Sequence, residues 1–142
     1  MIIEATIPID PGRLAINKAK RAGKRGGKPY TYKTPDYVAA VDELALRIRL
    51  ARAGRAFVAG PVSVTIAIAW PRKRRKGPAI DLPMGDLDAP IKGIFDAMTQ
   101  GGIWSDDAQA TSLAMISMVD AKSPRISIRV TDACVDNAQG SG

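Results

Sequence analysis

The chain has 142 residues, 46% of them hydrophobic, which suits one compact domain with its own core. It has no apolar run long enough to span a bilayer and no basic, apolar leader at its start, so we expect a cytoplasmic protein. The net charge is +7. The chain has a single cysteine, Cys134, which excludes a disulfide framework. It has no histidine, which with the single cysteine argues against a zinc site.

The first predicted strand covers residues 2–7. Residues 11–33 are rich in Gly and Lys and show no apolar period, so we expect a mobile basic loop that orders on a ligand. A helix then starts at Thr34 as its N-cap, with Pro35 at the first position, and Gly54 closes it. The expected buried face of this helix follows helical spacing: Val38, Val41, Leu44, Ala45 and Ile48.

Residues 62–70 alternate large apolar side chains with small ones, which predicts a strand with one buried face. Five basic residues follow, and residues 77–85 have the Gly and Pro content of a loop. A second helix is expected after Asp88, ending at Gly101 and Gly102. Its expected buried face is Ile91, Ile94, Phe95 and Met98.

The last predicted strands cover residues 112–119 and 125–130, and the polar segment 132–142 is expected to be a disordered tail. The order of elements is therefore strand, helix, strand, helix, strand, strand. This order indicates an α+β fold, with a small mixed sheet and two helices in a single domain over residues 1–131.

The positive charge is concentrated in two blocks. Between Arg13 and Lys33 there are eight basic residues and no acidic one. The second block is Arg72, Lys73, Arg74, Arg75 and Lys76. The rest of the chain has eight basic and 14 acidic residues, so the two blocks favour a polyanionic partner, most simply nucleic acid. We expect DNA contacts from the second block and from Lys24, Arg25 and Lys28; the alternative is a solvated basic surface.

Asp86 and Asp88 stand two positions apart, just before the second predicted helix. In extended backbone their side chains point to the same side, where two like charges repel each other. A divalent cation converts that repulsion into coordination, and oxygen ligands without histidine favour Mg²⁺ or Mn²⁺. The alternative is that Asp88 caps the helix and Asp86 is solvated.

Asp106 and Asp107 follow the second helix. Adjacent residues of an extended chain face opposite sides, so only one of them can join a site with Asp86 and Asp88. The alternative is a polar turn, and spacing does not choose between the two.

Lys92 lies in the first turn of the second helix, where the helix dipole disfavours a cation. A phosphate or carboxylate partner would explain this position. The alternative is an exposed lysine, which costs only about a few tenths of a kcal/mol.

One pattern begins at Gly85 and runs without gaps from Asp86 to Gln109. Its segments are Gly85-Asp86-Leu87-Asp88, Ile91-Lys92, Phe95-Asp96-Ala97-Met98 and Gly102-Ile103-Trp104-Ser105-Asp106-Asp107-Ala108-Gln109. Together they resemble the signature of the RusA family of Holliday junction resolvases.

The resemblance implies that Asp86, Asp88 and Asp107 are the catalytic, metal-binding carboxylates and that Lys92 is an active-site lysine. It implies a RusA-like fold and a Mg²⁺-dependent endonuclease, of bacterial or phage origin. Such an enzyme resolves four-way DNA junctions by paired symmetric nicks in recombination and repair. It also implies a homodimer, which suits a two-fold junction that needs two symmetric cuts.

The sequence departs from the family pattern at two places. Ala89 stands where the family usually has Asn, which removes an amide that would hydrogen-bond near the metal ligands. Residues 77–85 separate the basic run from the aspartates and add Asp81, a further candidate ligand.

Two other functions stay open at this stage. A non-catalytic DNA- or RNA-binding module would use the aspartates as caps and turns, and its binding would be salt-sensitive without metal or nicking. A nuclease for flaps or other branched DNA would share the same chemistry and differ in dimer geometry.

Overall fold

The computed structural model describes residues 2–15, 20–25, 28–55, 58–73, 82–83 and 85–133. Its elements are β1 (Ile2–Ile7), η1 (Pro11–Leu14), β2 (Lys20–Arg25), β3 (Lys28–Lys33), α2 (Pro35–Arg52), β4 (Val62–Trp70), α3 (Ile91–Gln100), η2 (Asp107–Gln109), β5 (Ala110–Val119) and β6 (Arg125–Asp132). The predicted order is confirmed, with a hairpin and two 3-10 turns in addition. Within the described ranges, none of the helices has the length and apolar character that crossing a membrane requires.

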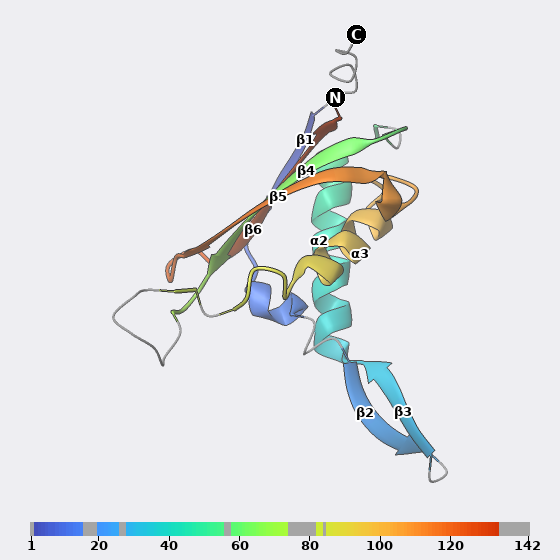
Figure 1. Cartoon of the computed structure of the whole chain (residues 1–142), viewed down its shortest axis with the longest axis vertical. Helices are drawn as coiled ribbons and strands as arrows, with labels where there is room; N and C mark the ends of the chain where they lie inside the picture. The colour runs from blue at the N-terminus through green and yellow to red at the C-terminus, as the bar shows by residue number, and fades with distance from the viewer. Residues whose placement is uncertain are drawn as a thin grey trace.

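Four of the strands form one mixed sheet in the order β1-β6-β4-β5 (Figure 1). β6 pairs antiparallel with both β1 and β4, whereas β4 and β5 run parallel. Parallel neighbours need a crossover connection, and α3 lies within it. The predicted α+β class, with a mixed sheet and two helices, is confirmed.

Both ends of α2 form as the sequence predicts. Thr34 Oγ1 accepts a hydrogen bond from the backbone N–H of Tyr37 at 3.4 Å, which satisfies a free donor of the first turn. At the other end Ala53 has a left-handed backbone with φ 54°, and Gly54 follows with φ 77°.

The buried faces of the two helices differ slightly from the prediction. α2 buries Tyr37, Ala40, Val41, Leu44, Ala45 and Ile48. Val38 is 40% exposed instead, because the buried stripe runs from Tyr37 through Leu44 and leaves Val38 on its flank. α3 buries Gly93, Ile94, Ala97 and Met98. Ile91 and Phe95, which we expected in the core, are half-buried.

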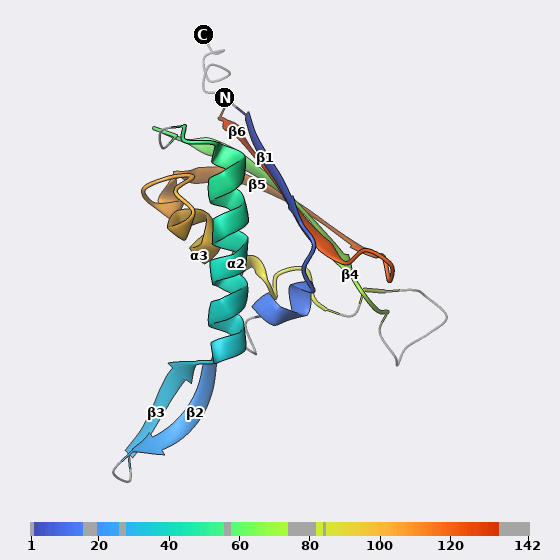
Figure 2. The same ribbon diagram turned by 180° about the vertical axis from the view of Figure 1, so that it is seen from behind.

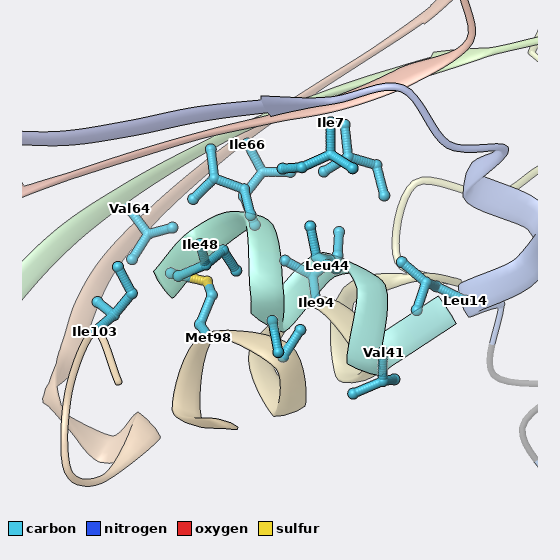
Figure 3. Close-up of a cluster of buried hydrophobic side chains, with 14 of the residues drawn as sticks. Ile7, Leu14, Val41, Leu44, Ile48, Val64, Ile66, Ile94, Met98 and Ile103 are labelled. Atoms are coloured by element: carbon cyan, nitrogen blue, oxygen red, sulfur yellow. The ribbon is translucent and has the colours of Figure 1, made fainter. Parts of the chain in front are cut away.

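Both helices cover the same face of the sheet, as the two opposite views show (Figures 1 and 2). In the layer between the helices and the sheet, Val64 and Ile66 of β4 face Leu44 and Ile48 of α2 and Ile94 of α3 (Figure 3). Each of these five side chains is 1% exposed or less. Burying an aliphatic side chain of this size contributes about 1.5–3 kcal/mol, so this layer holds the helices on the sheet.

The end of α3 packs closely against α2. A Cβ on Gly101 would lie 2.8 Å from Ile48 Cγ2 and 2.9 Å from the carbonyl oxygen of Ala45. The guanidinium of Arg49 donates to the carbonyl oxygen of Gln100 at 3.0 Å, which satisfies one of the last free acceptors of α3. The predicted glycine end of α3 is confirmed, and the close approach explains why a glycine is needed there.

The expected loop over residues 11–33 contains regular structure. η1 is capped by Asp10, whose carboxylate accepts from the backbone N–H of Gly12 at 2.8 Å. β2 and β3 pair antiparallel and form a hairpin that projects from the start of α2, away from the sheet (Figures 1 and 2). The sequence contains no apolar alternation to predict this hairpin, because its strands are mostly polar and basic.

The last strand is longer than predicted. β6 extends through Asp132, which pairs with Val62 of β4. Asp132 therefore belongs to the sheet and not to the tail that we expected to begin there. Ala133 is also held, since its N–H donates to the carbonyl oxygen of Pro61 at 3.0 Å, and residues 134–142 of the predicted tail lie outside the described residues.

Candidate active site and DNA interface

The acidic turn at residues 86–88 is anchored on the end of β4. Trp70, the last residue of β4, is 1% exposed, and its indole Nε1 donates to Ser117 Oγ of β5 at 2.9 Å. The backbone of Gly85 lies against this indole, since a Cβ there would be 2.1 Å from the ring atom Cη2. Only glycine fits such an approach, so Trp70 fixes where the turn begins.

The turn has a different backbone from the one we expected. The N–H of Ala89 donates to the carbonyl oxygen of Asp86 at 3.1 Å, and the N–H of Ile91 donates to that of Asp88 at 3.3 Å. The expectation of extended backbone from Asp86 to Asp88 is therefore wrong, because the chain makes two consecutive turns. α3 has Pro90 as its cap and no side-chain cap bond, so the carboxylate of Asp88 does not cap the helix. Both aspartates are exposed.

Lys92 has the kind of partner that its position predicts. Its ammonium donates to Asp96 Oδ1 at 3.0 Å, one helical turn along α3. The other carboxylate oxygen, Oδ2, accepts from the hydroxyl of Tyr37 on α2 at 3.3 Å. The carboxylate partner of Lys92 is thus a residue of its own helix, held from a second helix.

Asp106 and Asp107 have different roles in η2. The carboxylate of Asp106 accepts from the N–H of Ala108 at 2.9 Å, and the side-chain oxygen of Gln109 accepts from the N–H of Asp106 at 3.3 Å. The amide of Gln109 also donates to the carbonyl oxygen of Val58 at 2.7 Å, which ties the turn to the chain before β4. Asp106 is therefore the capping residue of a polar turn, and Asp107 is the exposed carboxylate beside it.

An open hollow of about 360 Å³ lies between α3 and this turn. Its lining residues are Asp96, Thr99, Gln100, Ser105, Asp106 and Asp107. The structure thus brings Asp107 together with Asp96, whereas Asp86 and Asp88 are not among the residues that line the hollow.

The donor types fit a hard divalent cation, because Asp86, Asp88 and Asp107 are exposed carboxylates and the chain has no histidine. These carboxylates do not form a complete set of metal ligands in their present arrangement. Among the residues that the structure describes, no three Asp, Glu, His or Cys side chains gather closely enough to hold a metal ion. One cation can bind Asp86, Asp88 and Asp107 together only if these carboxylates converge further.

The structure describes some of the basic residues that we expected to contact DNA. Arg72 and Lys73 are exposed just beyond Trp70, and Lys73 bridges to Pro83, so they lie at the end of β4 that also anchors the acidic turn. In the hairpin, Lys24 pairs with Pro29, and Arg25 pairs with Lys28. Arg74, Arg75, Lys76 and Asp81 lie outside the described residues.

The contacts of Asp96 and Tyr37 were not predicted from the sequence. The spacing of Lys92 and Asp96 by four residues was a usable signal, since side chains at i and i+4 of a helix are neighbours. No sequence signal pointed to Tyr37. Burial, the charge of Asp96 and the hydrogen bond to Asp96, in that order of importance, together raise the pKa of Tyr37 to about 12. The Tyr37 hydroxyl is therefore a permanent donor to Asp96 at physiological pH.

Comparison with known proteins gives a consistent result. A family model described as "Endodeoxyribonuclease RusA" matches residues 11–131. The crossover junction endodeoxyribonucleases RusA of Escherichia coli (strain K12) and of Enterobacteria phage 82 are each 33% identical to this chain over 75 residues. The alignment covers 53% of this chain and 55% of each relative, so the chain spans about half the length of the curated relatives it matches. Because the family match includes both helices, the hairpin and the acidic turn, the chain belongs to the endodeoxyribonuclease RusA family.

Proposed function

We propose that residues 1–131 form a metal-dependent endodeoxyribonuclease that resolves four-way DNA junctions in the cytoplasm of a bacterial host. The observation that carries this proposal is the family match over residues 11–131, which contains the exposed carboxylates on either side of α3. Two relatives are named as crossover junction endodeoxyribonucleases, which supports branched DNA as the substrate.

In this proposal Asp86, Asp88 and Asp107 hold Mg²⁺ or Mn²⁺. When bound, such a cation would supply the activation of a water and the stabilisation of the charge that develops on the phosphate. Lys92 is exposed and follows Asp88 by four positions in the sequence. In this proposal its ammonium neutralises a nonbridging oxygen of the same phosphate.

The basic residues hold the phosphate backbones of the junction arms. Arg72 and Lys73 start this surface beside the acidic turn, and Arg74, Arg75 and Lys76, which follow them in sequence, contribute to it. Lys24, Arg25 and Lys28, near the turn of the projecting hairpin, contact a second position on the DNA. Phosphate contacts of this kind carry no sequence information, so selectivity comes from the shape of the junction.

The proposed enzyme is a homodimer, and the edge of the sheet supports this. β5 is an edge strand of ten residues without a charged residue or a proline, and it exposes Leu113 by 41% and Ile116 by 55%. The opposite edge, β1, has six residues, contains Glu4 and is followed by Pro8, features that protect an edge from pairing. β5 lacks such protection, so it suits a partner strand.

A second copy of this chain fits the β5 edge by charge. Copies with a net charge of +7 repel each other overall, and β5 is a neutral segment that adds nothing to this repulsion. Asp106 and Asp107 precede β5, whereas Lys122 follows it next to the ion pair of Asp120 and Arg125 at 2.8 Å. Antiparallel pairing of two β5 strands places the acidic start of one beside the basic end of the other.

The decisive experiment compares the wild type with Asp88→Asn on a labelled four-way junction in Mg²⁺ and in Mn²⁺. We expect paired, symmetric nicks from the wild type, and junction binding without nicks from the variant. A matched control is Asp42→Asn, an exposed aspartate of α2 outside the proposed metal site, which should nick at the wild-type rate.

Two outcomes would contradict the proposal. Full metal-dependent nicking by Asp88→Asn would remove Asp88 from the metal site. Binding by both proteins with nicking by neither would favour a non-catalytic DNA-binding protein, and preferential cutting of flaps would change the substrate.

A further inference from the structure

Asp96 connects the two parts of the proposed active site. It lies in the middle of α3, where its carboxylate receives Lys92 Nζ at 3.0 Å on one oxygen and the Tyr37 hydroxyl at 3.3 Å on the other. It also lines the hollow that contains Asp107. Asp96 thus contacts Lys92, at the start of α3, and lines the hollow that Asp107 lines from beyond the end of α3.

The contact of Lys92 with Asp96 differs from an ordinary surface pair. An exposed pair at i and i+4 contributes little stability, and lysine before the acid is the less favourable order. Here the carboxylate is 29% exposed and is held by Tyr37, which is itself 3% exposed and belongs to α2. The buried tyrosine therefore fixes Asp96, and Asp96 in turn restricts where the exposed ammonium of Lys92 can lie.

We propose that Asp96 is a positioning residue, which orients Lys92 for the scissile phosphate through the tether to Tyr37. This inference rests on the proposed nuclease function. A lysine side chain loses considerable rotamer entropy when it is fixed, and a carboxylate that holds it in advance removes that loss from the reaction. Asp96 acts through Lys92 and not by contact with the DNA.

The test is a double-mutant cycle with Asp96→Asn and Lys92→Met on junction cleavage. Asn keeps the shape and an acceptor for Tyr37 but loses the charge that holds the ammonium. We expect Asp96→Asn to lower kcat by about 10–100-fold, the usual range for a residue that orients a catalytic group, with junction affinity unchanged. In the Lys92→Met background the same substitution should have no further effect.

A second readout does not depend on catalysis. Acylation consumes the free amine, so a lysine whose ammonium is held by a carboxylate reacts more slowly. Mass spectrometry after acylation therefore reports how strongly each ammonium is held. Asp96→Asn should raise the acylation rate of Lys92 several-fold and leave that of Lys122, an exposed lysine beyond β5, unchanged. Asp42→Asn, which removes a carboxylate hydrogen-bonded to Gln100 at 2.8 Å, is the matched control and should alter neither rate.

The outcomes separate this inference from the proposed function. A wild type that does not nick junctions contradicts the function, whereas unchanged acylation of Lys92 in Asp96→Asn contradicts the positioning role by itself. An equal loss of kcat from Asp96→Asn in both backgrounds would also overturn it, because a residue that acts only through the stability of α3 gives additive losses.

Discussion

At the scale of single residues, Gly101 determines how closely α3 approaches α2. A Cβ there would meet the carbonyl oxygen of Ala45 at 2.9 Å, and a backbone atom cannot move aside as a flexible side chain can. We expect Gly101→Ala to destabilise the protein by about 1–3 kcal/mol in urea unfolding, the usual cost of overpacking. Gly54→Ala is the control. An added Cβ at Gly54 would meet no atom within 4 Å, and the left-handed backbone (φ 77°) is the only source of strain there. This exchange should therefore cost about 1 kcal/mol. A loss at Gly101 no larger than at Gly54 would mean that the helices move apart easily.

At the scale of elements, the β2–β3 hairpin has a role that can be measured apart from catalysis. Because Lys24, Arg25 and Lys28 each neutralise a phosphate in the proposed complex, changing all three to Gln should weaken junction binding. The slope of log K against log salt should become shallower by about 3, at roughly 0.9 per contact. The triple exchange Lys24→Arg, Arg25→Lys and Lys28→Arg keeps every charge and should keep the slope. An unchanged slope in the neutral variant would show that the hairpin does not contact DNA.

At the scale of the whole molecule, the proposed dimer depends on one neutral edge. Ile116 is 55% exposed on β5, so Ile116→Lys should leave the fold intact while it places two like charges across the paired strands. We expect sedimentation equilibrium to show a dimer for the wild type and a monomer for this variant, with loss of paired nicks. Leu50→Lys changes an apolar side chain of α2 that is 67% exposed and should remain dimeric. A dimer that persists in Ile116→Lys would exclude β5 as the interface.

The sequence by itself determined the ends of the helices and the pattern of β4. The cap at Thr34, the glycine ends of both helices and the alternation in β4 are short-range signals, because they depend on neighbouring residues alone. The gapless pattern from Asp86 to Gln109 was sufficient to identify the family, which the family model confirms. The hairpin was missed because pairing between polar strands has no apolar period.

Only the tertiary structure decided how the candidate site is arranged. The turn at Asp86 replaces the expected extended chain because Gly85 packs on Trp70, a contact over 15 positions that no local pattern encodes. The tether from Tyr37 to Asp96 depends on the packing of α2 against α3. The free edge of β5 depends on the order of strands in the sheet. Each of these features joins residues that are distant in the chain, and packing of the hydrophobic core, rather than local preference, fixes their relative positions.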